Sequence, residues 1–383
     1  MPKVAIFLNQ CLPLSEVFIR HQAKSLHKYE PRLIGCRKAH PSVDTGMLEI
    51  ILNRYNSIGD RIEEILFKAT GQSLGVTTMF KGYDIVHAHF GPTGWLASGP
   101  AQRARKPLIV TLHGFDVLKN DITIKKDGLL QYIYSKRRHE LFSRAQAFIC
   151  VSEYVKKRAV EFGFPEEKCH VLYMGIPLGE FKTPKQERKP GEPLRLFAAG
   201  RLVPFKGHKK LIDAVAVVQK AGYKVSLDIA GDGPLREELQ AQAASSLTDC
   251  TFHGAVPYAK MMVMMRNSDI FCHTAMHMEN GQTEAFGLVV SEAQWAGLPV
   301  VAFASGGVPE AMQDGRTGIL CKEGDVNSFA KAIMELIDNP AKRAEMSRAA
   351  PDFVRDNFDI YVQSGKLQKL YDTVIEKFNG ARI

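Results

Sequence analysis

The chain contains no apolar run near the roughly 20 residues that a membrane-spanning helix needs, and its first residues lack a long apolar region. A transmembrane segment and a secretory signal peptide are therefore not predicted, and we expect a cytoplasmic protein. The seven cysteines include no Cys-x-x-Cys pair, and Cys36, Cys150 and Cys272 lie inside apolar runs. This usage excludes a disulfide scaffold and favours buried free thiols in a reducing compartment.

Patterns typical of metal and nucleic-acid binding are also missing. No Asp-x-Asp motif occurs, and His87, His89 and His113 have no third ligand at a suggestive spacing, so we expect no metal site. No recognised DNA- or RNA-reading module is present, and the basic runs lack interleaved aromatic residues that could stack on bases. We therefore expect no nucleic-acid partner.

Positive charge is in excess. The 383 residues include 50 Lys and Arg against 41 Asp and Glu, a formal net charge of +9. Basic clusters at 136–138 and 156–158 fall on predicted helices, and Arg103, Arg105 and Lys106 lie nearby in sequence. Each basic residue near an anionic membrane contributes on the order of 1 kcal/mol, so one interpretation is peripheral contact with the inner face of the cytoplasmic membrane. The other interpretation is that these basic residues lie on ordinary solvent-exposed faces of helices.

The N-terminal half alternates short apolar runs with segments of helical periodicity. The predicted strands are 4–8, 32–36, 84–88, 108–112, 147–151 and 170–173, and the predicted helices include 17–26, 58–67 and 154–162. Such alternation is typical of a mostly parallel sheet with both faces covered. Ligands of these sheets lie at the carboxyl ends of the strands. The polar residues that the sequence places there are His87, His89, His113 and Asp116.

A second strand–helix series begins at the predicted strand 194–200. The loop that follows carries Arg201 and Lys206 and leads into a periodic helix, which is how an α/β sheet holds phosphates at its carboxyl edge. The Arg201 guanidinium can donate hydrogen bonds to two phosphate oxygens at once, and the Lys206 ammonium provides a single positive charge. Another predicted strand, 225–231, ends in a Gly-x-Gly turn, which alone is a weak signal.

Two glutamates flank the start of a predicted helix. Apolar residues recur at helical spacing after Gly287, so the helix begins there, and its first amides suit a diphosphate. Eight residues separate Glu284 from Glu292, about 12 Å along a helix, whereas the two carboxyls of a retaining hydrolase lie about 5 Å apart. We therefore expect separate roles, near a sugar for Glu284 and near ribose hydroxyls for Glu292. The alternative is that Glu284 and Glu292 are ordinary solvent-exposed acids of a helix, without a role in binding.

Together these elements resemble glycosyltransferase family 4, a retaining family with the GT-B fold. The motifs that carry the resemblance are the loop 200–207, the turn 230–234, the strand end 252–254, the Glu-x7-Glu element 284–292 and the turn 306–310. They occur in the family's order in the C-terminal half, and the N-terminal half matches more loosely. Many members carry a glycine pair in the loop after the first strand. The corresponding loop of this chain, residues 9–16, contains no glycine, so the role of that glycine pair cannot be assigned to it. The loop 9–16 and the element 87–92 are similar to those of bacterial exopolysaccharide and colanic-acid-type transferases.

The resemblance also implies roles for individual residues. The expected donor-binding residues are Gly200, Arg201, Lys206, Gly231, Gly233, Phe286, Gly287, Leu288 and Glu292. The expected catalytic residues are His113, Glu284, Arg201 and Lys206, and the expected acceptor or sugar contacts are Ser15, Glu16, His87, His89 and Asp116. In this scheme Arg201 and Lys206 hold the diphosphate, and Glu284 and His113 face the donor sugar. The alternative for His113 is that it is a loop residue that caps a turn and does not contact the donor sugar.

The fold class implied is α/β, with two Rossmann-like parallel-sheet domains facing each other across a cleft. The expected bounds are 1–176 for the acceptor domain, 177–193 for a linker, 194–357 for the donor domain, and about 358–383 for a last helix that crosses back to the first domain. The implied activity is retaining transfer of a sugar, with UDP as the expected carrier, to a saccharide or lipid-linked acceptor of exopolysaccharide, lipopolysaccharide or glycolipid synthesis. Neither a metal nor a cofactor is expected. A nucleotide-sugar epimerase, a glycogen-synthase-like polymerising transferase and a non-catalytic nucleotide-sugar-binding protein remain alternatives.

Overall fold

The computed structural model describes residues 1–11, 16–38, 46–179 and 191–381. The chain forms two compact units: unit 1 comprises Met1–Pro177 with Ile360–Ile383, and unit 2 comprises Leu178–Asp359. Most of the predicted linker, 177–193, lies outside the described residues. Among the described residues, no helix is long and apolar enough to cross a membrane.

Unit 1 is built on a seven-stranded parallel sheet with the order β3-β2-β1-β4-β5-β6-β7. Its strands are β1 (Lys3–Cys11), β2 (Glu30–Lys38), β3 (Glu49–Ile51), β4 (Ile85–His89), β5 (Leu108–Leu112), β6 (Ala147–Cys150) and β7 (Cys169–Val171). Its helices are α1 (Val17–Lys24), α2 (Ile58–Thr70), α3 (Leu74–Phe80), α4 (Gly91–Ala104), α5 (Phe115–Leu118), α6 (Asp121–Ile124), α7 (Leu129–Arg144), α8 (Glu153–Glu161) and α15 (Ile360–Gly380). Strands β4 and β5 are buried along their whole length, as expected for central strands covered on both faces.

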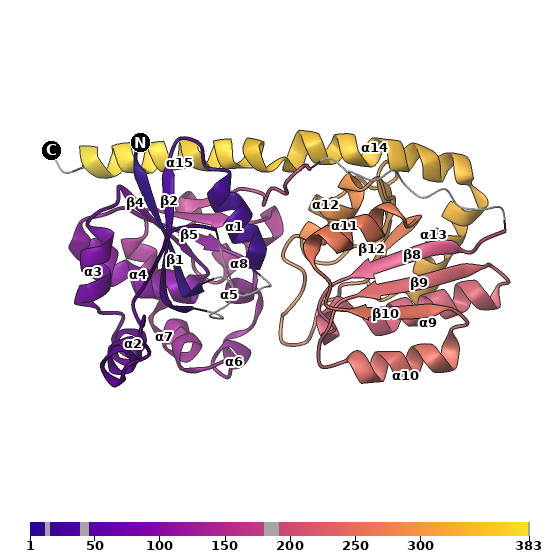
Figure 1. Cartoon of the computed structure of the whole chain (residues 1–383), viewed down its shortest axis with the longest axis horizontal. Helices are drawn as coiled ribbons and strands as arrows, with labels where there is room; N and C mark the ends of the chain where they lie inside the picture. The colour runs from indigo at the N-terminus through magenta and orange to yellow at the C-terminus, as the bar shows by residue number, and fades with distance from the viewer. Residues whose placement is uncertain (12–15, 39–45, 180–190, 382–383) are drawn as a thin grey trace. The chain divides into compact units, whose positions relative to one another are not determined.

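The last helix, α15, belongs to unit 1 and runs along it (Figure 1). Leu367, Tyr371 and Val374 recur at helical spacing and join the core that β1 and α1 build. Polar contacts fix the register of the helix. The Tyr29 hydroxyl donates to Asp372 at 2.5 Å, and Gln368 accepts from the backbone of Lys28 at 2.6 Å. Unit 1 is therefore made from two segments that are distant in sequence.

Unit 2 is built on a six-stranded parallel sheet with the order β10-β9-β8-β11-β12-β13. Its strands are β8 (Leu194–Ala199), β9 (Val225–Ala230), β10 (Cys250–Gly254), β11 (Ile270–His273), β12 (Val300–Phe303) and β13 (Gly318–Cys321). Its helices are α9 (His208–Lys220), α10 (Arg236–Ser246), α11 (Tyr258–Arg266), α12 (Leu288–Trp295), α13 (Val326–Asp338) and α14 (Pro340–Phe358). The order places the ends of β8 and β11 side by side, which brings two loops of the candidate site together.

The predicted α/β class with two parallel sheets is confirmed. The strand β3, three half-buried residues at the edge of its sheet, is not predicted from the sequence. The predicted strand 84–88 also ended one residue early, since β4 continues to His89. His89 is therefore, like His87, a residue of the buried strand β4.

Candidate functional site

The loop after β8 carries the two cations predicted to bind the diphosphate. Arg201 follows Gly200 directly, is exposed, and forms no ion pair among the described residues. A short 3-10 turn, Pro204–Lys206, then leads to Gly207, which adopts φ +68° and precedes α9. A Cβ at Gly207 would lie 1.9 Å from the Thr274 carbonyl oxygen, so this loop packs against the loop after β11 backbone to backbone.

Lys206, Glu284 and His273 form a cluster in unit 2. The Lys206 ammonium is paired with the Glu284 carboxylate, and both side chains are only 14% exposed. The Nε2 atom of His273, at the end of β11, lies 3.4 Å from the same carboxylate. Burial alone would raise the pKa of Glu284, but the charge of Lys206, with His273 close by, outweighs it and holds that pKa below its usual range. Burial likewise lowers the pKa of His273, so the cluster contains an ionised carboxylate and a neutral imidazole at neutral pH.

The backbone of Glu284 is held by the glycine pair that follows β12. Gly307 donates its amide hydrogen to the Glu284 carbonyl at 3.0 Å. A Cβ at Gly306 would lie 2.1 Å from the Glu284 carbonyl oxygen, and one at Gly307 would lie 2.1 Å from that of Ala285. Only glycine permits these approaches. The turn 306–310 therefore acts as a support for the Glu284 loop.

Helix α12 begins where the sequence predicts. Gly287 is its N-cap residue, with φ +96°, and Leu288 is its first residue. Phe286 is buried and packs edge-on against Phe358, which anchors the turn before the helix. The first amides of α12 are thus presented beside the loop that carries Glu284, an arrangement suited to an anion.

Glu292 lies in the second turn of α12. Its carboxylate makes no side-chain hydrogen bond with any residue that the structure describes, and burial raises its pKa to about 8. Glu284 by contrast is paired and ionised. The predicted separation of roles is therefore matched by two opposite electrostatic environments. An unpartnered acid of this kind is a candidate for binding hydroxyl groups.

The turn with Gly231 and Gly233 packs against the loop after β8. Gly231 adopts φ +148°, and a Cβ there would lie 1.8 Å from the Gly200 carbonyl oxygen. The backbone of Leu202 donates to the Asp232 carbonyl at 2.9 Å, which links the two loops beside Arg201. The structure thus gives these glycines a role in close backbone packing.

Replacing Gly231 with alanine should lower the free energy of unfolding by about 3 kcal/mol, because the methyl group collides with backbone in a φ region that alanine rarely adopts. Gly222→Ala is the matched control, since Gly222 has φ +93° but open space around its Cα. In the control variant the free energy of unfolding should fall by about 1 kcal/mol. Urea denaturation measures both values, and equal losses would show that positive φ alone, and not the contact with Gly200, sets the requirement.

In unit 1, the site residue predicted with most weight is His113, directly after β5. Its Nε2 lies 2.9 Å from Nδ1 of His89, and its ring contacts those of Phe18 and Phe90. Burial lowers the pKa of His113 to about 3, so its imidazole is neutral at physiological pH. One nitrogen of the His89–His113 pair therefore donates to the other.

Three predicted acceptor contacts in unit 1, His87, His89 and Asp116, have buried side chains. His87 is fully buried and bonds to the Tyr371 hydroxyl at 2.6 Å and to Thr111 at 2.7 Å. His89 is buried against His113. Asp116 accepts from the backbone amides of Gly91 at 2.8 Å and Gly114 at 2.9 Å, so it shapes the loops on either side of His113. Their role as acceptor contacts stays a prediction, and the buried Nε2 atom of His89 has no hydrogen-bond partner among the described residues.

The loop before α1 is only partly described. Ser15 lies outside the described residues, and Glu16 precedes α1 without capping it through a side-chain hydrogen bond. Burial raises the pKa of Glu16 to about 7. Glu16 therefore stays a candidate acceptor contact.

The sequence analysis missed His273. The signal available was a histidine at the end of an apolar strand, Phe271-Cys-His273, the same pattern that singled out His113. His208 was missed in the same way: it is buried beside Lys206 and His273, and burial lowers its pKa to about 3. Across the described ranges, no group of three or more His, Cys, Asp or Glu side chains is arranged to hold a metal ion.

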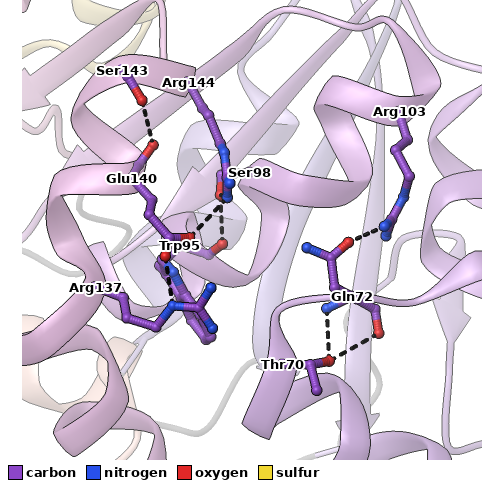
Figure 2. A network of polar contacts seen from close by, with 9 residues as sticks. All are labelled: Thr70, Gln72, Trp95, Ser98, Arg103, Arg137, Glu140, Ser143 and Arg144. Atoms are coloured by element: carbon purple, nitrogen blue, oxygen red, sulfur yellow. Dashed lines mark hydrogen bonds and ion pairs between the residues drawn. The ribbon is translucent and has the colours of Figure 1, made fainter.

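Several cations of the predicted basic clusters are neutralised within unit 1. Arg137 and Arg144 both bind Glu140, and the Arg137 guanidinium lies over the Trp95 ring, as Figure 2 shows. Arg138 pairs with Asp121 and Arg158 with Glu161. These pairs leave Lys136, Lys156 and Lys157 as the members of the two clusters without an ion pair in the described part of the chain.

Comparisons with known proteins agree with this geometry. The family model described as glycosyl transferases group 1 matches residues 180–353, and the model Glycosyltransferase Family 4 matches residues 19–180. WcaL of Salmonella typhimurium, a glycosyltransferase named for colanic acid biosynthesis, is 25% identical over 297 residues, which cover 76% of this chain and 71% of that protein. The amylovoran biosynthesis glycosyltransferase AmsK of Erwinia amylovora is 26% identical over 295 residues, which cover 76% and 70%.

Solved structures share the fold. HepE of Anabaena, in complex with UDP and glucose, superposes with a TM-score of 0.76 at 19% identity, covering 97% of this chain and 100% of the other. The two family models together span residues 19–353, and the chain has two parallel α/β sheets. The chain therefore belongs to the group 1, family 4 glycosyltransferases with the GT-B fold.

Proposed function

We propose that this glycosyltransferase moves a sugar from UDP to an acceptor hydroxyl with retention at the anomeric carbon. The observation that carries the proposal is the cluster of Lys206, Glu284 and His273 beside the exposed Arg201 and the start of α12. It combines cations and backbone amides for a diphosphate with a fixed carboxylate for sugar hydroxyls. UDP is favoured by analogy, since HepE was solved with UDP and glucose.

Charge develops on the diphosphate as the bond to the sugar breaks. Arg201, Lys206 and the first amides of α12 stabilise that charge, and because they are already in place no reorganisation is needed at the moment of reaction. Glu284 does not attack the sugar; its pairing with Lys206 fixes it as an acceptor for donor hydroxyls. The departing phosphate oxygen takes the proton from the acceptor hydroxyl. Transfer through this scheme requires no metal ion.

His113 and Glu292 complete the assignment. His113 presents a neutral imidazole, and we assign it to a hydroxyl of the donor sugar. Glu292 is assigned to the ribose hydroxyls, for which it has a free carboxylate. The acceptor proposed is a saccharide or a lipid-linked saccharide of exopolysaccharide assembly, by analogy with the relatives named for colanic acid and amylovoran synthesis.

A panel of UDP-, GDP- and ADP-sugars tests the donor site. UDP-sugars should raise the melting temperature of the wild-type protein, with or without magnesium, and Arg201→Ala should lose most of that shift because it lacks the diphosphate fork. Lys210→Ala, a change at a lysine on α9 close to the loop, is the control. Stabilisation by GDP- or ADP-sugars alone would overturn the choice of UDP, and dependence on magnesium would overturn the metal-free scheme.

Product analysis separates the remaining alternatives. The proposed enzyme converts donor only when an acceptor is present and releases one UDP per bond formed. Conversion of the donor sugar without acceptor would indicate an epimerase, and a ladder of products from a glucan primer would indicate a polymerising transferase. Binding of the donor without any turnover in the presence of oligosaccharide or lipid-linked acceptors would indicate a binding protein.

A further inference from the structure

Helix α2 of unit 1 has its apolar side facing solvent. Ile58, Ile62, Ile65 and Leu66 recur at positions i, i+4, i+7 and i+8 and therefore share one side of the helix. With Tyr55 just before the helix, these side chains are between 52% and 80% exposed. We call these five residues the α2 face. A surface helix normally turns such a side toward the core, so the α2 face requires a partner.

The opposite side of α2 explains this orientation. Phe67 packs into the core, and the buried Glu64 carboxylate is held by Lys68 and by Asn53 at 2.7 Å. Ser57 caps the helix and Gly71 ends it in the left-handed conformation, so the helix is fixed at both ends. The exposed apolar side is therefore a defined feature of the fold and not the result of a frayed segment.

Neighbouring helices extend the apolar surface. Helix α7 packs against both α2 and α6, and the three helices lie along one end of unit 1 (Figure 1, lower edge). Helices α6 and α7 expose three further large apolar side chains, Ile122, Leu129 and Tyr132. These helices therefore add exposed apolar side chains of their own at the same end of unit 1.

The charges around this surface are positive on balance, although Asp60 and Glu63 of α2 form no ion pair with a residue that the structure describes. Five cations of the same segments form no ion pair among the residues that the structure describes: Arg54, Arg61, Lys125, Lys126 and Lys136. The acids of α6 and its flanks are neutralised, since Asp121 pairs with Arg138 and Asp127 with Lys119. Of the 50 Lys and Arg, 29 fall in unit 1 together with 18 of the 41 Asp and Glu, which gives unit 1 a net charge of +11 and unit 2 a net charge of −2.

We propose that the α2 face, with the cations beside it, is the surface by which unit 1 docks on an anionic lipid bilayer. An interfacial helix inserts its apolar side among the lipid chains while basic residues bind the headgroups. A second copy of the chain is a poorer occupant, because a symmetric contact would bring two surfaces of the same sign together. The inference goes beyond the proposed function, since none of these residues belongs to the donor site.

Vesicle flotation tests the surface directly. Wild-type protein should float with vesicles of phosphatidylcholine and phosphatidylglycerol, bind pure phosphatidylcholine vesicles at least tenfold less, and dissociate as salt is raised. The double variant I62N/L66N should lose at least tenfold in partition to anionic vesicles, because it removes the centre of the apolar side. The matched control is Y361N/V362N, which changes two exposed apolar residues of α15.

Two further measurements keep the outcome unambiguous. The melting temperature with UDP should be the same for wild type and I62N/L66N, which separates loss of docking from loss of the donor site. Equal flotation of wild type and I62N/L66N, or no flotation of wild type, would overturn the proposal. A wild-type dimer in size-exclusion chromatography that I62N/L66N converts to monomer, without vesicle binding, would assign the surface to a second copy instead.

Discussion

Lys206→Met should reduce kcat/KM for donor turnover by about a thousandfold, the upper range for loss of one preorganised group at a developing charge. The same change removes the partner of a buried carboxylate, so the free energy of unfolding should fall by about 3 kcal/mol. The matched control is Lys209→Met, because Lys209 pairs with Glu238 at the surface, where an ion pair contributes little. Steady-state kinetics and urea denaturation measure the two effects.

The double variant K206M/E284Q separates stability from catalysis. A neutral amide no longer needs the ammonium, so part of the lost stability should return. Turnover should remain as low as in the single variant, because the diphosphate still lacks Lys206. If K206M kept wild-type turnover, or if the double variant recovered it, Lys206 would be a structural partner of Glu284 and not a diphosphate ligand.

Glu292→Gln should stabilise the unliganded protein at pH 8 while weakening its binding of UDP. Burial raises the pKa of Glu292 to about 8 in the folded protein, against about 4.5 in an unfolded chain. The folded state therefore holds a proton that the unfolded state has released, and wild-type stability falls as pH rises from about 4.5 to 8. Glutamine has no such loss, so the variant should gain roughly 2 kcal/mol at pH 8, the full shift being discounted because the residue is partly exposed.

The accompanying loss of UDP affinity has a specific signature. Ribose hydroxyls donate to a carboxylate, so UDP binding should ionise Glu292 and release close to one proton at pH 7. Calorimetry in buffers of different ionisation enthalpy measures that proton. Glu292→Gln should release none, whereas Glu237→Gln, at an exposed acid of α10, should behave as wild type. Equal proton release from wild type and E292Q would remove Glu292 from the ribose site.

The sequence was sufficient for those parts of the site that lie on one continuous segment. The helix start at Gly287 and the positions of Glu284 and Glu292 follow from a single stretch of glycine and apolar periodicity. His273 could not be placed, because its proximity to Glu284 depends on the order of strands in the sheet, which brings β11 beside β8. Sheet order is a property of the whole fold and is not encoded in local spacing.

Besides the order of strands, the burial of individual side chains could not be predicted from the sequence. The sequence places His87 and His89 at the carboxyl end of a strand, where ligands bind, but β4 lies at the centre of its sheet, where Tyr371 and Thr111 satisfy the ring of His87. Helix 58–67 was predicted from its apolar periodicity, but that periodicity did not show that Ile62 and Leu66 face solvent. Tertiary context decided both cases, through the partners available to a polar side chain and through the burial of Phe67 on the opposite side of α2.

Because α15 belongs to unit 1, the two units can complete their folding only in a certain order during synthesis. Tyr371, which closes the core of unit 1 and bonds to His87, leaves the ribosome only after all of unit 2 has been made. At ordinary translation rates, the interval between residue 177 and residue 371 is roughly 10 to 40 s. During that time the nascent first unit lacks its final helix, whereas unit 2 has its whole sequence as soon as residue 359 has been made. Unit 2 is therefore expected to mature first, and a chain interrupted before residue 371 will expose the groove that α15 fills and become a substrate for chaperones and proteases.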